Sequence, residues 1–196
     1  EAFAREGAQT VIAATSERNL AAAAEAIAAT GGPKPVTAVL DLRKLEDCQK
    51  LHALVKKGLG RCDVLVNNAG ATRAGNFLEL TDELWQDGFA LKFFGCVRLS
   101  RLFWPMLKEA RGSVVNIGGG AARTPGAEFT IGASCNAAMA NFSKALSRLG
   151  MKDDVTVNII HPGLTETDRI QDLFAQRASA AGKTIDEIRV EAVARD

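Results

Sequence analysis

The sequence has no tyrosine among its 196 residues, and it has only two tryptophans and two histidines. Without a phenol side chain, no mechanism that needs tyrosine as a proton donor is open to this chain. An excess of one charge is also lacking, because 24 lysines and arginines balance 23 acidic residues. Proteins that bind nucleic acids or membrane surfaces usually carry a basic excess, so neither partner is expected. No apolar run approaches the roughly 18 residues that a bilayer-spanning helix needs.

Cysteine is scarce and scattered. The four cysteines lie at least 14 residues apart, so the sequence has no Cys-x-x-Cys pair. With only two histidines beside them, the spacing of a zinc site is absent as well. We therefore expect no bound metal, and isolated reduced thiols are typical of a cytoplasmic protein.

Short β-branched runs alternate with longer helical patterns. The runs predict strands at residues 10–14, 36–40, 64–67, 113–117 and 155–160. The intervening segments predict helices at 19–30, 45–57, 81–110 and 129–149, and a last helix that begins at a Thr184–Glu187 capping pattern. Strands joined by helices of this length indicate parallel βαβ units. We predict an α/β fold, a three-layer, Rossmann-like, doubly wound parallel sheet covered by helices on both faces.

Small or turn-forming residues follow four of the predicted strands. In open parallel sheets ligands bind beyond the carboxyl ends of the strands, and close approach to a flat ligand favours such residues. In chain order these segments are Asp41-Leu42, Asn67-Asn68-Ala69-Gly70, Gly118-Gly119-Gly120 and His161-Pro162-Gly163, with Thr167 shortly after. We expect them to share one site.

The Asn-Asn-Ala-Gly segment, with a Pro-Gly loop about ninety residues later, resembles the short-chain dehydrogenase/reductase family. The resemblance covers nearly the whole chain and implies a domain that binds a nicotinamide dinucleotide. It implies that Asp41 and Leu42 flank the adenine. It also implies that Asn68, Ala69 and Gly70 line the adenosine ribose and brace the central strands.

The same resemblance assigns the nicotinamide half of the site. Pro162 and Gly163 would lie against the nicotinamide, Thr167 would hold its carboxamide or a phosphate, and Ile117 would be a further cofactor contact. The whole chain, 1–196, would then be one partial dinucleotide-binding domain, with 164–196 as a helical segment on the substrate side.

The family's glycine-rich turn, which holds the pyrophosphate at a helix N-terminus, has no counterpart here. Residues 1–6 resemble a helix end capped by Gly7, whereas such domains open with a strand. The missing first strand would lie between the strands at 10–14 and 64–67, leaving a gap of about 10 Å. We predict that the chain is a fragment of a longer protein, and direct pairing of those two strands would contradict this. A short helix that starts the domain by itself is the alternative.

The family's catalytic Ser, Tyr and Lys, and the Asn that completes its proton relay, are all replaced. Ile131 stands at the tyrosine position, Cys135 at the lysine position, and Gly118 or Gly119 at the serine position. Lys92 stands at the position of the asparagine. The family's usual tyrosine-based ketone reduction is therefore unsupported by the sequence.

Lys92 interrupts an apolar stripe of Trp85, Phe89, Cys96, Leu99 and Phe103. Such a lysine reaches water, pairs with an acid, or is buried, and burial lowers the pKa of a lysine toward neutrality. Our hypothesis is that Lys92 supplies the missing cation from the neighbouring helix. A nucleophilic Cys135 lacks an evident base. His161 either orders the proline turn or takes part in catalysis.

The choice between NAD and NADP depends on the end of the strand at 10–14. NAD-binding members usually carry an acid there, which accepts hydrogen bonds from the ribose hydroxyls. Ala14 stands in its place, and Arg18 is close enough in sequence to reach a 2′-phosphate. NADP is therefore favoured over NAD.

Two functions remain open from the sequence. One is an atypical NAD(P)-dependent oxidoreductase acting on a small carbonyl or hydroxyl compound. The other is a catalytically dead relative that binds a dinucleotide or a partner chain. The helices at 81–110 and 129–149 resemble the pair through which family members form homodimers and homotetramers. Exposed Phe94 and Phe103 would fit that role, although core packing explains them equally well.

Overall fold

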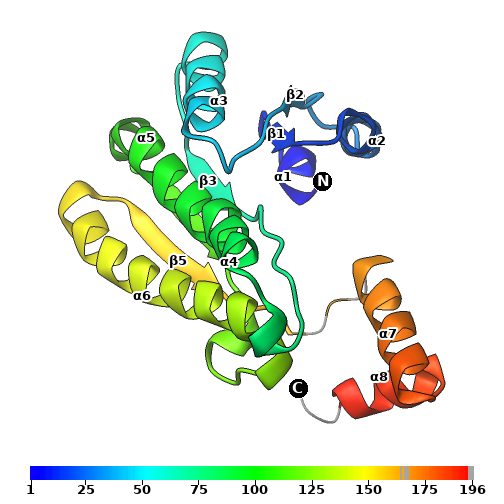
Figure 1. The fold of residues 1–196 in the computed structure, drawn as a ribbon. Coiled ribbons are helices and arrows are strands. Elements are labelled where there is room, and N and C mark those ends of the chain that lie inside the picture. Colours follow the sequence, from blue (N-terminus) through cyan, green and yellow to red (C-terminus); the bar gives the residue numbers. More distant parts are fainter. Residues whose placement is uncertain (164, 166–167, 194–196) are drawn as a thin grey trace.

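Figure 1 presents the computed structural model, which describes residues 1–163, 165 and 168–193. Helices alternate with parallel strands, so the predicted α/β fold class is confirmed. The strands are β1 (Val11–Ala14), β2 (Val36–Val39), β3 (Val64–Asn67), β4 (Ser113–Ile117) and β5 (Thr156–Ile160). The helices are α1 (Ala2–Arg5), α2 (Glu17–Ala28), α3 (Leu45–Gly58), α4 (Asp82–Phe89), α5 (Gly95–Ala110), α6 (Thr130–Asp153), α7 (Asp168–Ala181) and α8 (Ile185–Val193).

The strands form two parallel sheets. β1 pairs with β2, and β3, β4 and β5 pair in that order. Asn67 stands opposite Asn116, and Ile117 stands opposite Ile160, so the carboxyl ends of the three strands are level. Within the described part of the chain, β1 and β3 form no ladder. Direct pairing of β1 with β3, which would contradict a missing first strand, is therefore not found among the described residues. That the chain is a fragment of a longer protein stays a prediction.

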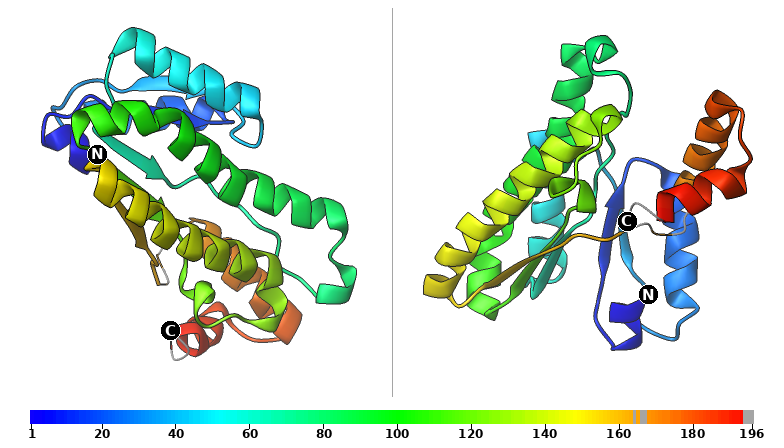
Figure 2. Two further views of the ribbon diagram at one scale, coloured as in Figure 1. Left: turned by 90° about the vertical axis from the view of Figure 1, so that its left-hand side faces the viewer. Right: turned by 90° about the horizontal axis from the view of Figure 1, so that it is seen from below.

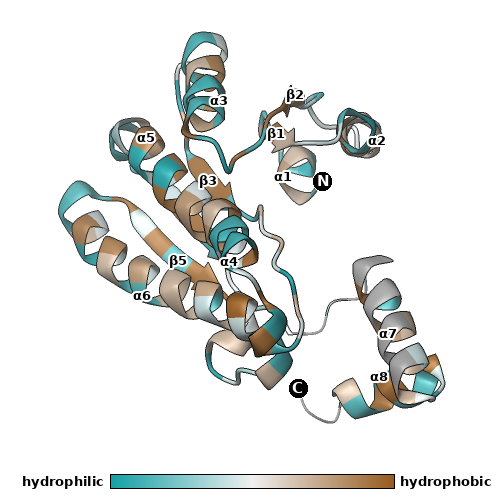
Figure 3. Ribbon diagram, viewed as in Figure 1, coloured by the Kyte–Doolittle hydropathy of each residue, from teal (hydrophilic) through white to brown (hydrophobic). Residues whose placement is uncertain are grey.

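The core lies between the three-stranded sheet and the helices on one of its faces. Cys48, Leu107 and Val114 are fully buried there. The helices α5 and α6 run side by side along this face (Figure 2), and Trp104 Nε1 of α5 donates to Asp153 Oδ2 of α6. On the other face Val66 is 42% exposed and Ile160 is 52% exposed. Apolar residues nevertheless make up most of β3 (Figure 3). The sequence predicts helices on both faces of the sheet. In the residues described, helices cover the second face incompletely.

The helix predicted at 81–110 is broken into three parts. A π-helical turn, Ala90–Phe94, separates α4 from α5. A π-turn inserts a residue and rotates the side chains that follow it. Phe103 is 3% exposed, so the alternative of core packing holds for it, whereas Phe94 is 46% exposed.

The last two helices pack on each other. Phe174, Ala178 and Ile188 form their small core, and Figure 1 shows the pair set off from both sheets. The predicted capping pattern is confirmed, because the Thr184 N–H donates to Glu187 Oε2 at 2.8 Å and the Glu187 N–H donates to Thr184 Oγ1 at 3.3 Å. In the portion of the chain with described placement, every helix is too short or too polar to cross a bilayer.

Candidate functional site

The loops that leave β4 and β5 meet at the carboxyl edge of the sheet. The Gly118 N–H donates a 2.8 Å hydrogen bond to the carbonyl oxygen of Ile160. The Nδ1 atom of His161 lies 3.2 Å from the Gly119 nitrogen and 3.0 Å from its carbonyl oxygen. The two loops are therefore adjacent, as the order of the strands requires.

A buried hydrogen-bond network fixes these strand ends. Asn67 Nδ2 donates to Asn116 Oδ1 at 2.8 Å and to Ser100 Oγ at 3.2 Å. Asn116 Nδ2 donates to Ser143 Oγ on α6 at 2.8 Å, and the Cys96 thiol donates to Asn116 Oδ1 at 3.3 Å. The network ties β3 and β4 to α5 and α6, and it therefore sets the position of α6 over the strand ends.

Lys92 lies across the loop that follows β3. A Cβ atom on Gly70 would stand 3.1 Å from both Cγ and Cδ of Lys92, so the absence of a side chain at Gly70 makes room for the lysine stem. Lys92 is half-buried in the π-helical turn, and such turns often occur at functional sites. Burial raises the pKa of the Cys135 thiol to about 11, and the charge of Lys92 opposes that rise. The charge of Lys92 therefore acts on Cys135 of α6.

The pair of positions expected to replace the catalytic tyrosine and lysine faces the core. Ile131 and Cys135 are fully buried, and a Cβ atom on Gly88 of α4 would stand 2.6 Å from Ile131 Cγ2. A thiol whose pKa is about 11 is protonated at neutral pH, so a nucleophilic Cys135 is not supported. The face of α6 that meets the end of β4 carries Gly132 and Asn136 instead.

Two polar side chains occupy the space beside the glycines that follow β4. A Cβ atom on Gly118 would stand 2.7 Å from His161 Nδ1. A Cβ atom on Gly119 would stand 2.9 Å from Asn136 Nδ2. Both glycines at the expected serine position are therefore required by neighbours that fill the place of a side chain.

On α6 the Phe129 ring fills the place of a side chain on Gly132. A Cβ atom on Gly132 would overlap this ring. Phe129, Gly132 and Asn136 are not among the residues that the sequence predicts at the site. The available signal was a second pair at a spacing of four, Gly132 and Asn136, one residue beyond Ile131 and Cys135.

The predicted adenine residues have partners of their own. Asp41 Oδ1 accepts hydrogen bonds from the Arg43 backbone N–H at 3.1 Å and from its Nη1 at 3.2 Å. Arg43 Nε donates to Asp87 Oδ1 at 2.6 Å, and this bond raises the pKa of Arg43. The Leu42 side chain belongs to the core, and its carbonyl oxygen accepts a 3.5 Å hydrogen bond from the buried Cys48 thiol.

The end of β1 presents Arg18 to solvent. Ser16 caps α2 by accepting a 3.2 Å hydrogen bond from the Asn19 N–H, and Arg18 lies in the first helical turn. Ala14 and Arg18 are both exposed. A basic side chain at a helix N-terminus is suited to a phosphate group.

The remaining predicted cofactor residues differ in exposure. Asn68, Ala69, Pro162 and Gly163 are exposed, whereas Ile117 is half-buried at the end of β4. Thr167 lies outside the described residues.

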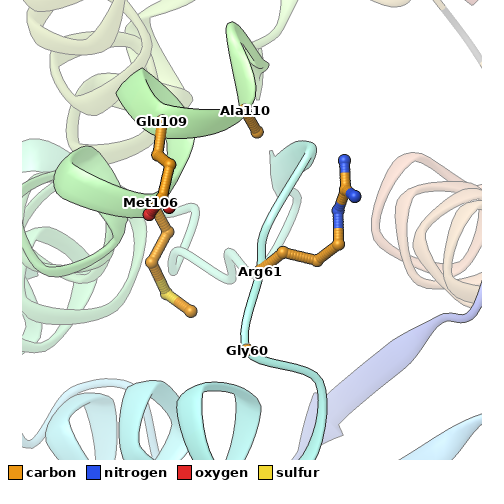
Figure 4. Close-up of a pocket in the computed structure, with 5 residues that line it drawn as sticks. All are labelled: Gly60, Arg61, Met106, Glu109 and Ala110. Atoms are coloured by element: carbon orange, nitrogen blue, oxygen red, sulfur yellow. The ribbon is translucent and has the colours of Figure 1, made fainter.

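A cavity also lies at the opposite end of the sheet. A cavity of about 270 Å³ is lined by Gly60, Arg61, Met106, Glu109 and Ala110 (Figure 4). Gly60 and Arg61 precede β3, so the cavity lies at the amino end of that strand, opposite the edge where ligands bind in such sheets. Among the residues with described positions, no group of three or more His, Cys, Asp or Glu side chains could hold a metal ion.

Parallel strands with helical crossovers and small-residue loops at one carboxyl edge define a Rossmann-like α/β protein. The family model described as short chain dehydrogenase matches residues 1–178. The chain therefore belongs to the short-chain dehydrogenase/reductase family, a family of oxidoreductases.

Relatives of this chain include enzymes with different substrates. It is 32% identical over 169 residues to the 3-oxoacyl-(acyl-carrier-protein) reductase FabG of Haemophilus influenzae, covering 86% of this chain and 68% of that protein. It is 29% identical to 11-beta-hydroxysteroid dehydrogenase A of Sesamum indicum, covering 98% of this chain. The chain spans only 58% of the length of the Sesamum protein.

Two solved structures are similar in fold. The L-sorbose reductase of Gluconobacter frateurii, complexed with NADPH and L-sorbose, matches with a TM-score of 0.88 and 28% identity, over 95% of this chain and 71% of that one. A short chain oxidoreductase of Pseudomonas aeruginosa PAO1, bound to NADPH and described as containing an atypical catalytic center, matches with a TM-score of 0.78 and 26% identity, over 94% of this chain and 78% of that one.

Proposed function

We propose that this chain belongs to an atypical NAD(P)-dependent oxidoreductase that acts on a small carbonyl or hydroxyl compound in the cytoplasm. The observation that carries the proposal is the meeting of three loops at one edge, where Lys92 crosses Gly70 and His161 contacts Gly119. Family members with NADPH bound support the cofactor class. The family's full catalytic set is absent from the sequence, so the proton source differs from the usual one.

The residues present fit the nicotinamide half of a dinucleotide. Beside Gly119, Asn136 Oδ1 is buried without a hydrogen-bond partner. Pro162 and Gly163 are exposed beside them, where a flat ring would lie against the backbone. Arg18, rather than an acid, at the end of β1 favours a 2′-phosphate, so NADP is the proposed cofactor.

Lys92 is the proposed proton donor. When bound, the cofactor supplies the hydride that reduces the carbonyl carbon. The carbonyl oxygen must then take a proton, and Lys92 reaches the site from the π-helical turn with its stem against Gly70. In the reverse direction the neutral amine of Lys92 would accept the proton of the alcohol.

The test compares the kcat of the Lys92→Met variant with that of the parent protein. General acid catalysis is typically worth 10²–10⁴ in rate, so kcat should fall by about that factor. NADPH affinity, followed by the fluorescence of the nicotinamide, should change little. Lys144→Met, an exposed lysine on α6, is the matched control. Equal activity of Lys92→Met and the parent ends this role for Lys92.

A catalytically dead protein is the second candidate. The glycines at the expected serine position and the buried Ile131 and Cys135 favour it, because none of them offers a proton at the site. Oxidation of NADPH by the protein against a panel of small aldehydes and ketones separates the two functions. Binding of NADPH without turnover of any carbonyl would favour the second.

Self-association through α5 and α6 is also proposed. Phe94 is 46% exposed at the start of α5, with the Arg98 guanidinium 5.7 Å from its ring centroid. An exposed aromatic ring on this helix supports a homodimer or homotetramer as the working assembly. Gel filtration with light scattering tests it, and a monomer at all concentrations would remove it.

A further inference from the structure

Asn136 is a buried polar residue with an unmet hydrogen-bonding need. Its side chain projects from α6, the residue is only 2% exposed, and its Oδ1 atom has no hydrogen-bond partner. An unpartnered buried polar atom costs stability, and such atoms in folded proteins call for an explanation. Asn67 Oδ1 on β3 is buried without a partner as well, but the Asn67 Nδ2 donates to Asn116 and Ser100. In Asn116 both ends of the carboxamide are bonded.

The Asn136 carboxamide lies at the edge where the loops converge. Its Nδ2 atom is 2.9 Å, and its Oδ1 atom 3.5 Å, from the place where a Cβ on Gly119 would stand. His161 contacts the backbone of the same glycine. The amide group therefore occupies the volume that a serine hydroxyl at position 119 would enter.

We propose that Asn136 is a catalytic residue that binds the reacting oxygen of the substrate. Its Nδ2 would donate to a carbonyl oxygen during reduction, and its Oδ1 would accept from the alcohol during oxidation. A neutral carboxamide can stabilise developing negative charge on oxygen in this way, as asparagine does in oxyanion holes. This inference rests on the proposed oxidoreductase function and concerns the same site.

A reciprocal substitution experiment tests the proposal. Asn136→Leu keeps the branched shape of the side chain and removes its polar atoms, and kcat should fall by about 10²–10³, with NADPH affinity unchanged. Asn141→Leu, which alters an exposed asparagine on the same helix, should leave both unchanged. Gly119→Ser alone should also lose activity, because its side chain meets Asn136 Nδ2.

A double variant distinguishes a catalytic role of Asn136 from a structural one, because its kcat can recover only if a polar group at this place acts on the substrate. Asn136→Ala empties the space beside Gly119, and Asn136→Ala with Gly119→Ser places a hydroxyl in that space. The double variant should therefore recover at least tenfold in kcat over Asn136→Ala. Thermal unfolding of every variant is measured alongside, and the expected midpoint of Asn136→Leu is equal to or above that of the parent.

Each outcome has a meaning. An active parent with an equally active Asn136→Leu overturns the Asn136 proposal alone. Weaker NADPH binding with unchanged kcat assigns Asn136 to a cofactor hydroxyl and overturns the substrate role. A markedly lower unfolding midpoint for Asn136→Leu, without rescue by the double variant, makes Asn136 structural. A parent that binds no NADPH and reduces no carbonyl overturns the oxidoreductase function, and the Asn136 role with it.

Discussion

The Asn67 carboxamide on β3 donates a 2.8 Å hydrogen bond to Oδ1 of Asn116 on β4, at paired positions of the ladder. Both residues are buried, and the network continues through Ser143 to the carbonyl oxygen of Met139 on α6. The strand ends and the helix over them are therefore held by polar bonds as well as by apolar packing.

Asn116→Leu should lower the free energy of unfolding by about 2 kcal/mol. The substitution leaves Asn67 and Ser143 with buried groups that have lost a partner, and each such loss costs about 1–3 kcal/mol. Urea denaturation measures the change. Asn158→Leu, at an exposed position of β5, is the control and should alter stability by less than about 0.5 kcal/mol. Equal midpoints for the two variants would show that the network contributes nothing.

Restoring a tyrosine on α6 should fail unless Phe129 is also changed. In Gly132→Tyr the new side chain collides with the Phe129 ring, and overpacking of this kind costs about 1–3 kcal/mol. Phe129→Ala combined with Gly132→Tyr should recover most of that loss in a thermal unfolding measurement. Ser134→Tyr, an exposed position on the same helix, is the control. A Gly132→Tyr variant as stable as Ser134→Tyr would contradict the packing described.

All four thiols should react slowly at neutral pH. Burial raises the pKa of Cys62 and of Cys135 to about 11 and that of Cys96 to about 12, and it also raises the pKa of Cys48. The reactive thiolate is therefore scarce in the folded protein. Titration with a chromogenic disulfide at pH 7.5 should give slow labelling of the folded protein and four rapid equivalents in urea. One thiol that reacts rapidly without urea would show that a cysteine is activated.

Asp153 should stabilise the fold above about pH 4 and lose this effect in acid. Its bonds from Lys108 Nζ at 2.6 Å and Trp104 Nε1 at 2.8 Å lower its pKa. Because the folded-state pKa lies below the unfolded one, the contribution is complete above the unfolded value, near 3.9, and disappears as the pH falls through the folded value. Asp153→Asn should therefore be less stable than the parent at pH 7, and the difference should shrink in acid.

Measuring the free energy of unfolding of Asp153→Asn and of the parent at several pH values checks this pH dependence. Asp154→Asn alters a neighbouring carboxylate that is exposed and paired with Arg111 at 3.5 Å, so it should show little of this pH dependence. A difference between Asp153→Asn and the parent that stays constant from pH 7 to pH 3 would contradict the assignment.

The sequence by itself determined the elements and the edge at which the site lies. Strand runs and helix periods are local patterns, so β1–β5 and most helices fall close to the predicted ranges. Parallel pairing places every strand's carboxyl end on one side, and the glycines and prolines after β3, β4 and β5 mark that side without knowledge of packing.

Only the tertiary structure decided which side chains face the site. Two pairs on α6 share a spacing of four residues, and the contact of Ile131 with Gly88 of α4 turns Ile131 and Cys135 inward and Asn136 toward Gly119. A helix rotates by about 100° per residue, so an error of one residue exchanges a core face for a site face. That rotation is set by contacts distant in sequence, which no local pattern records.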